Sequence, residues 1–321
     1  MASADSIKRI SVVGAGLMGH GIAQVFALAG RQVTLTDARA ESLPKAKEGI
    51  GAILDEFVKY DLATRAEADA ALGRVSLEPD FETAVKDADY VVEAVFEDMG
   101  IKQEVFERLD KVCRPGVILT SNTSGLSSNG IASRTKRKAL CAVTHFWNPP
   151  HILPLVEVVR NDETSDETVD TILNVLRSAN KVPVVVRKDI PGQIGNRLQY
   201  ALFREAVSLV ENGVCSADDV DTVIKKSFGR RLPTIGILET ADVNATSLWA
   251  NISHYLFKEL DTAQDTHQYL KDLIEKGRTG VKAGGGFHDW PADKLEGTLA
   301  RRDAELLRWL QVDKREREKG G

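Results

Sequence analysis

A histidine and a glutamate twelve residues apart have the residue types that an alcohol oxidation needs. His145 follows the strand-like segment 142–144, and Glu157 lies inside the apolar segment 155–159. Removing the hydroxyl proton of an alcohol requires a base, and histidine titrates closest to neutral pH. A carboxylate in an apolar strand is costly unless it is paired, so we expect Glu157 to fix the tautomer of His145 and raise its basicity. The alternative is a buried ion pair that serves only the structure.

A glycine-rich turn predicts a dinucleotide site. Its residues are Gly14, Gly16, Leu17, Met18 and Gly19. The first glycine permits a tight turn, the second lets the backbone approach a pyrophosphate, and the third lets helix pack against strand. Asp37 ends the next strand-like segment, where a carboxylate bonds the ribose hydroxyls of NAD. Two alternatives remain: a turn that only packs a helix, and an Arg39 that holds the 2′-phosphate of NADP.

The segments that must position these residues alternate between strand and helix over the first 190 residues. Short Val/Ile-rich runs predict strands at 10–13, 32–36, 90–93, 117–120, 142–144, 155–159 and 182–186. Their alternation with helix-like segments such as 17–29 and 39–60 predicts a Rossmann-type, doubly wound parallel α/β sheet. The later segments 193–211, 236–260 and 265–276 are helix-like, and Ser216 is typical of a helix N-cap. We therefore expect an NAD-binding domain over 1–188 and an all-helical substrate and dimerisation domain over 189–321.

Composition narrows the function classes. The 321 residues suffice for two domains at about 150 residues each. The chain is 43% hydrophobic and carries a net charge of −5, which argues against global disorder, a nucleic-acid partner and an anionic membrane surface. The N-terminus shows no signal-peptide pattern, and the three cysteines lack CxxC spacing. We expect a cytoplasmic protein with reduced thiols and no metal site.

In combination and in order, several motifs resemble the 3-hydroxyacyl-CoA dehydrogenase superfamily over essentially the whole chain. The matching blocks are 12–19, 91–94, 121–124, 145–149, 155–157, 191–197 and 282–287. The resemblance implies NAD as cofactor, His145 as general base and Glu157 as its orienting partner. It implies that Ser124 and Asn196 hold the reacting oxygen of the substrate. The further cofactor-binding positions that it implies are Glu97, Lys102, Asn122, Asn148 and Lys282.

Other features look more like the free-acid branch of this superfamily, which includes lambda-crystallin, or L-gulonate 3-dehydrogenase. They lie in the segments 148–154, 196–201, 205–213 and 229–236. Arg231 stands where acyl-CoA members usually have no arginine, so it is a candidate to clamp a substrate carboxylate; an ordinary surface arginine is the alternative. The segment 45–61, expected to meet the nucleotide of CoA, is not strongly basic. The segment 282–287, in contrast, is typical of the acyl-CoA branch.

We therefore expect an NAD-dependent dehydrogenase, a homodimer, that oxidises the 3-hydroxyl of a small 3-hydroxycarboxylic acid to the 3-oxo acid. A short-chain L-3-hydroxyacyl-CoA dehydrogenase, acting on the CoA thioester, is the first alternative. A non-catalytic NAD-binding structural or sensor protein is the second.

Overall fold

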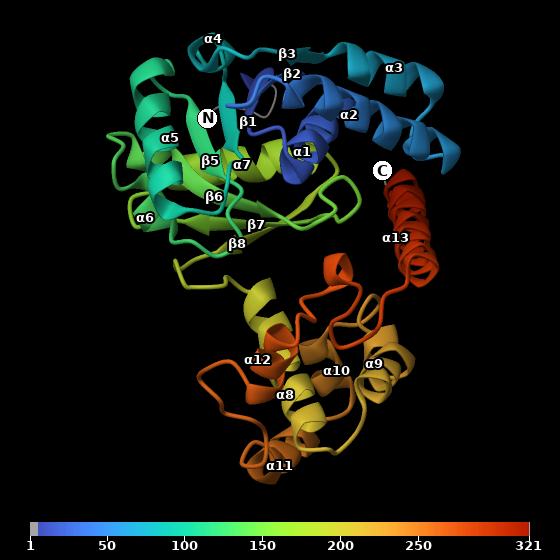
Figure 1. The fold of residues 1–321 in the computed structure, drawn as a ribbon. Helices are drawn as coiled ribbons and strands as arrows, with labels where there is room; N and C mark the ends of the chain where they lie inside the picture. The colour runs from blue at the N-terminus through green and yellow to red at the C-terminus, as the bar shows by residue number, and fades with distance from the viewer. Residues whose placement is uncertain (1–5, 321) are drawn as a thin grey trace. The chain divides into compact units, whose positions relative to one another are not determined.

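The computed structural model describes residues 6–320 and divides the chain into two units (Figure 1). The first unit ends at Asn196 and resumes at Arg302, and the second is Arg197–Arg301. The predicted boundary at residue 188 therefore differs from the structural division in two respects. Residues 189–196 and the C-terminal stretch both belong to the first unit.

An eight-stranded sheet forms the centre of the first unit, in the order β3-β2-β1-β4-β5-β6-β7-β8. The strands are β1 (Arg9–Val13), β2 (Gln32–Thr36), β3 (Val75–Leu77), β4 (Tyr90–Glu93), β5 (Ile118–Ser121), β6 (Cys141–Phe146), β7 (Leu155–Arg160) and β8 (Val182–Val186). Every neighbouring pair is parallel except β6 and β7. A parallel return needs a crossover of about a dozen residues or more, and the connection 147–154 is shorter than that. The predicted doubly wound fold is confirmed, with this one antiparallel pair and the short strand β3 added.

Helices cover both faces of this sheet. They are α1 (Leu17–Leu28), α2 (Ser42–Lys59), α3 (Arg65–Gly73), α4 (Phe81–Val85), α5 (Met99–Val112), α6 (Ser128–Ala132) and α7 (Asp166–Ser178). One core cluster joins the sheet to α1, α2, α3 and α7, and includes Phe26, Ile50 and Ile172. A second cluster joins it to α4, α5 and α6, and includes Phe106 and Ile131. The strand ends that carry the site residues are therefore held between two packed layers.

Within Arg197–Arg301, no described residue belongs to a strand, as predicted. The helices are α8 (Gly195–Glu211), α9 (Ala217–Lys226), α10 (Ile237–Val243), α11 (Thr246–Leu256), α12 (Gln268–Glu275) and the start of α13 (Ala292–Gly320). Ser216 caps α9 in a reciprocal capping box with Asp219. The helix-like segment 236–260 is two helices, because Ala245 between them adopts a positive φ of 71°.

The end of α13 packs against the sheet unit. Leu307 is fully buried in a small cluster with Ile53, Phe57 and Ile152. The helix is also anchored by Gln311, which donates to the carbonyl oxygen of Tyr60 at 2.6 Å. The second part of this helix is thus a docked element of the first unit. No helix among residues 6–320 is long and apolar enough to span a membrane.

Candidate active site

The register of the antiparallel pair brings the predicted base and its partner together. His145 on β6 lies directly opposite Glu157 on β7. The Nδ1 atom of His145 lies 3.0 Å from Oε2 of Glu157, and both side chains are buried. Because a carboxylate accepts hydrogen bonds only, Nδ1 carries the proton in this pair. In the neutral histidine with this tautomer, the Nε2 atom has a lone pair, which is the arrangement that a general base requires.

Glu157 is fixed by more than the histidine. Its Oε1 accepts from the backbone N–H groups of Ile194 and Gly195, at 2.9 and 3.0 Å, where α8 begins. Its Oε2 also accepts from Nε1 of Trp147 at 3.2 Å. Burial raises the pKa of Glu157. The hydrogen bonds from His145 and from the backbone N–H groups of Ile194 and Gly195 together lower it by more, so the pKa lies below its usual value. The carboxylate is therefore held ionised beside the imidazole.

The segment 193–196 connects this pair to the predicted oxygen-binding residues. Asn196 donates through Nδ2 to the backbone carbonyl of Ser124 at 2.7 Å, one residue after Gly195 contacts Glu157. The backbone N–H of Ser124 donates to Glu97 at 2.8 Å. Four predicted site residues, Ser124, Asn196, Glu157 and Glu97, thus share one hydrogen-bonded chain. The sequence analysis did not single out Trp147, although its indole N–H lies two residues after His145, within the block 145–149.

The glycine turn has the shape that a dinucleotide requires. Gly14 adopts a φ of +110°, and a Cβ there would lie 2.5 Å from the carbonyl oxygen of Ala94. A Cβ on Gly19 would collide with the carbonyl oxygen of Gly14, whereas one on Gly16 would meet no atom within 4 Å. The outer glycines are thus required by packing, and the central one leaves open space at the N-terminus of α1. That opening and the helix N-terminus fit a pyrophosphate, so these residues suit NAD.

Asp37 lies where a ribose would meet the turn. Its Oδ2 accepts from the backbone N–H of Ala15 at 2.7 Å, and its Oδ1 accepts from that of Arg39 at 2.9 Å. The guanidinium of Arg39 is exposed and lies 3.8 Å from the same carboxylate. The carboxylate therefore faces the phosphate-binding turn, and Arg39 sits beside it as a weak ion-pair partner.

Lys102 is buried rather than displayed at the surface. Its ammonium lies 2.8 Å from Oε1 of Glu93 and 3.4 Å from Oε2 of Glu97. Glu93 is also fully buried, and it accepts from the hydroxyl of Ser121 and the backbone N–H of Val95. Sequence reasoning overlooked Glu93 as a site-supporting residue. The signal that found Glu157, a carboxylate within an apolar strand-like segment, applies to it equally.

The remaining predicted site residues lie outside the hydrogen-bonded groups described above. Asn122 accepts from the backbone N–H of Phe146 at 2.9 Å and so ties β5 to β6. Asn148 is exposed and precedes Pro149 across a cis peptide bond. Lys282 and Arg231 belong to the helical unit, where both are exposed. The structure thus gathers the residues of the first unit at the carboxyl edge of its parallel strands, where open α/β sheets bind ligands.

This fold and this site together define an NAD-binding dehydrogenase. Residues 9–190 match the NAD binding domain of 3-hydroxyacyl-CoA dehydrogenase, and residues 192–290 match its C-terminal domain. The chain belongs to the 3-hydroxyacyl-CoA dehydrogenase family and is an NAD-dependent oxidoreductase acting on a CH–OH group.

Three relatives show how far the similarity extends. The chain is 32% identical to the 5-formyl-3-hydroxy-2-methylpyridine 4-carboxylate 5-dehydrogenase of Mesorhizobium japonicum, over 94% of this chain and 96% of that one. A crystal structure of a dehydrogenase of that name, described as an NAD⁺-dependent dismutase, superposes with a TM-score of 0.90 at 30% identity and covers 96% of this chain and 99% of that chain. The (S)-3-hydroxybutyryl-CoA dehydrogenase of Ralstonia eutropha superposes with a TM-score of 0.75 at 29% identity, over 89% and 100% of the two chains.

Proposed function

We propose that this dehydrogenase oxidises the 3-hydroxyl group of a small 3-hydroxycarboxylic acid to the 3-oxo acid, with His145 as the general base. The observation that carries the proposal is the buried His145–Glu157 pair, with Nδ1 engaged and Nε2 left to accept a proton. An intact pair of this kind, joined by hydrogen bonds to Ser124 and Asn196 through the segment 193–196, argues against a non-catalytic NAD-binding protein.

Each residue has a distinct role in this mechanism. The Nε2 atom of His145 removes the hydroxyl proton as the C–H hydride leaves. Glu157 stays ionised and stabilises the imidazolium that forms. Ser124 and Asn196 supply a hydroxyl and an amide N–H, which stabilise charge on the substrate oxygen without acting as competing bases. NAD, when bound, supplies the acceptor for the hydride.

The position of α13 favours a free acid over a CoA thioester. The segment 45–61 is the part expected to meet the CoA nucleotide, and α13 packs on its second half. Leu307 contacts Ile53 and Phe57 in one apolar cluster, and Lys314 donates to the carbonyl oxygen of Asp61 at 2.8 Å. This helix also lies beyond residue 290, where the match to the family's C-terminal domain ends. The chain's own helix thus covers part of the segment that we expect to meet a CoA nucleotide.

The structural superpositions support the same choice. The structure that superposes with a TM-score of 0.90 is named for a pyridine carboxylate, and the CoA thioester dehydrogenase superposes with 0.75. The name of the former also includes a formyl group, so a formyl carboxylate is a second substrate class worth including in assays. A short-chain 3-hydroxyacyl-CoA thioester remains the alternative that the family description favours.

We propose Arg231 as the residue that binds the substrate carboxylate. Its guanidinium is exposed, and no ion pair with a carboxylate of residues 6–320 engages it. Losing one partner of a charge pair in a closed site costs about 2–5 kcal/mol. We therefore expect Arg231→Met to raise KM for the free acid about 30-fold or more, with a smaller effect on kcat. Arg230→Met, which removes the adjacent exposed charge, should leave KM unchanged; an equal effect of both variants would point to general electrostatics instead.

Cofactor choice is a separate expectation. Asp37 should accept from the ribose hydroxyls of NAD and repel the 2′-phosphate of NADP. We expect kcat/KM for NAD to exceed that for NADP by about tenfold or more, equivalent to a repulsion of about 1.4 kcal/mol or more. Steady-state kinetics with each cofactor measures this ratio. Equal or better use of NADP would mean that Arg39 outweighs Asp37.

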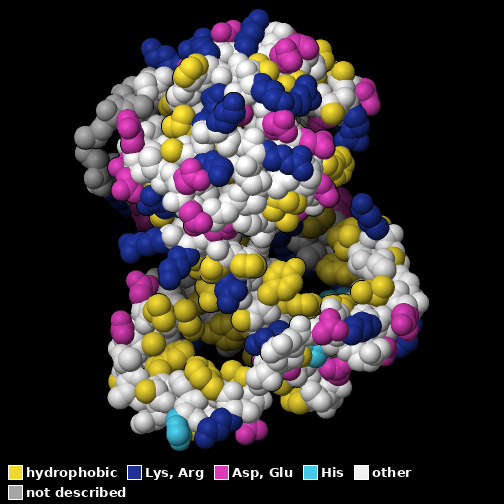
Figure 2. All heavy atoms as spheres, turned by 90° about the vertical axis from the view of Figure 1, so that its left-hand side faces the viewer, with side chains coloured by type: hydrophobic (Ala, Val, Ile, Leu, Met, Phe, Trp, Pro, Cys, Tyr) yellow, Lys and Arg dark blue, Asp and Glu magenta, His cyan; other side chains and the backbone are white. Residues whose placement is uncertain are grey.

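We also propose that the protein is a homodimer that associates through its helical unit. Figure 2 shows hydrophobic side chains gathered on this unit. Within this unit, Leu238, Val243 and Phe257 are 78, 75 and 67% exposed. Large exposed apolar patches mark interaction sites on soluble proteins. Light scattering, which gives the mass in solution, tests this proposal.

A further inference from the structure

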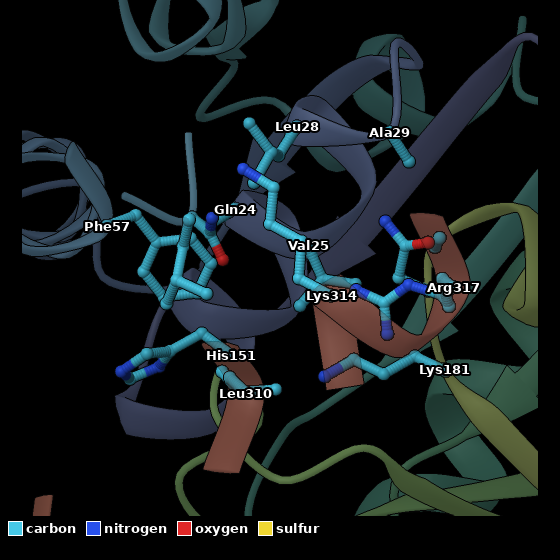
Figure 3. A pocket seen from close by; sticks show the side chains of 13 residues that line it. Gln24, Val25, Leu28, Ala29, Phe57, His151, Lys181, Leu310, Lys314 and Arg317 are labelled. Carbon is cyan, nitrogen blue, oxygen red and sulfur yellow. The ribbon is translucent and has the colours of Figure 1, made fainter. Parts of the chain in front are cut away.

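A basic pocket lies in the first unit, away from the hydrogen-bonded chain of the active site (Figure 3). It has a volume of about 80 Å³, enough for a few water molecules or one small polyatomic ion. Its walls come from the second half of α1, from Phe57 on α2, from His151, from residues 179–181 and from the docked end of α13.

Three cations line this pocket, and no carboxylate is among its lining residues. Lys181 is 7% exposed, and its ammonium donates to the carbonyl oxygens of Pro150 and Leu153 at 2.6 and 3.0 Å. An ammonium has three donors, so one of them is left for the pocket. Burial lowers the pKa of Lys181 to about 7. A neighbouring negative charge would restore the charged form of this group.

The other two cations come from α13. Lys314 donates one hydrogen bond to the carbonyl oxygen of Asp61. In the part of the chain that the structure describes, no carboxylate lies within ion-pair distance of Arg317; Asp313, one turn earlier, acts on it only electrostatically. In Figure 3 the side chains of Lys314 and Arg317 extend from α13 into the view that also contains Lys181. Three like charges around one small cavity repel one another unless an anion lies between them.

Gln24 provides an independent sign of a missing ligand. Its side chain is fully buried and lines the same pocket, yet neither its amide nitrogen nor its amide oxygen has a hydrogen-bond partner among residues 6–320. The Nδ1 atom of His151, in the opposite wall, is also buried and without a partner. Buried polar atoms are satisfied in the great majority of cases. A hydrogen-bond acceptor in the pocket would satisfy the amide nitrogen of Gln24.

We propose that this pocket binds a small oxyanion, a phosphate or a carboxylate, between Lys181, Arg317 and the amide of Gln24. The anion would accept from the free donor of Lys181, from the guanidinium of Arg317 and from the amide N–H of Gln24. Because these groups come from the start of β8, from α13 and from α1, the bound anion clamps α13 onto the sheet unit. The proposal does not depend on the identity of the substrate.

Isothermal titration calorimetry on the NAD-saturated full-length protein tests the proposal. Saturating NAD fills the phosphate-binding turn, and sodium chloride keeps the ionic strength constant. The two probes are inorganic phosphate and acetate, and the stronger binder identifies the class of anion. We expect saturable binding of at least one probe and a rise in Tm with its concentration.

Two variants and two controls locate the site. Arg317→Met and Gln24→Leu should each weaken binding about tenfold or more, because each removes a hydrogen bond to the anion. Arg315→Met removes an exposed charge from the same helix without touching the pocket and should leave binding unchanged. Arg317 is itself an exposed side chain, so its variant should fold normally. No saturable binding of either probe, unchanged binding in Arg317→Met, or loss of binding in Arg231→Met instead would each overturn the proposal.

Discussion

Replacing His145 with glutamine is expected to lower kcat by about 10²–10⁴-fold, the usual contribution of general base catalysis. Glutamine keeps a polar side chain of similar reach opposite Glu157 but cannot take up the hydroxyl proton. The affinity for NAD should be unchanged, because His145 contacts Glu157 and not the glycine turn. Steady-state kinetics and a separate titration of NAD measure the two quantities.

Two further variants define the control for this result. Glu157→Gln should lose less activity than His145→Gln if the carboxylate only orients and stabilises the imidazole. His254→Gln changes an exposed histidine of the helical unit and should turn over like the original protein. Near-normal turnover of His145→Gln would remove the proposed mechanism, and the buried pair would then be structural only.

Replacing Lys102 with methionine is expected to lower the free energy of unfolding by about 3–5 kcal/mol. The substitution leaves the fully buried carboxylate of Glu93 without its cation, and an uncompensated buried charge carries a penalty of this size. Chemical denaturation followed by circular dichroism measures the change. If Lys102 served only to contact the cofactor, Lys102→Met would lower the affinity for NAD and leave the free energy of unfolding unchanged.

Lys111→Met is the matched control on the same helix. Lys111 forms an exposed pair with Glu107, four residues earlier, and surface pairs of this kind contribute about 0–1 kcal/mol. Lys111→Met should therefore lower the free energy of unfolding by only about 0–1 kcal/mol. Similar losses in Lys102→Met and Lys111→Met would show that the buried pair with Glu93 has no special weight.

Local patterns predicted the parts of the site that follow from strand and turn chemistry. The three glycines, Asp37 and the pairing of His145 with Glu157 could be anticipated, because each depends on residue types within a strand or directly after one. The antiparallel direction of β7, which places those two side chains opposite each other, depends on the short connection 147–154. The length of this connection can be read from the sequence. Which residue of β7 lies opposite His145 depends on the register of the folded sheet.

Other features depend on contacts between distant segments. The docking of α13 joins Leu307 to Ile53 and Phe57, some 250 positions earlier in the chain. A charged helical end gives no sign of such a partner, since its buried face is set by a few apolar residues. The burial of Lys102 beside Glu93 likewise depends on the folded sheet edge, and the predicted role of Lys102 in binding the cofactor stays a prediction.

A free 3-hydroxycarboxylic acid is the proposed substrate, and NADH formation tests this proposal directly. The absorbance of NADH is followed with a panel of free 3-hydroxy acids, a formyl pyridine carboxylate, and 3-hydroxybutyryl-CoA under identical conditions. We predict that at least one free acid gives a higher kcat/KM than the CoA thioester. A kcat/KM for 3-hydroxybutyryl-CoA far above that of every free acid would contradict this account.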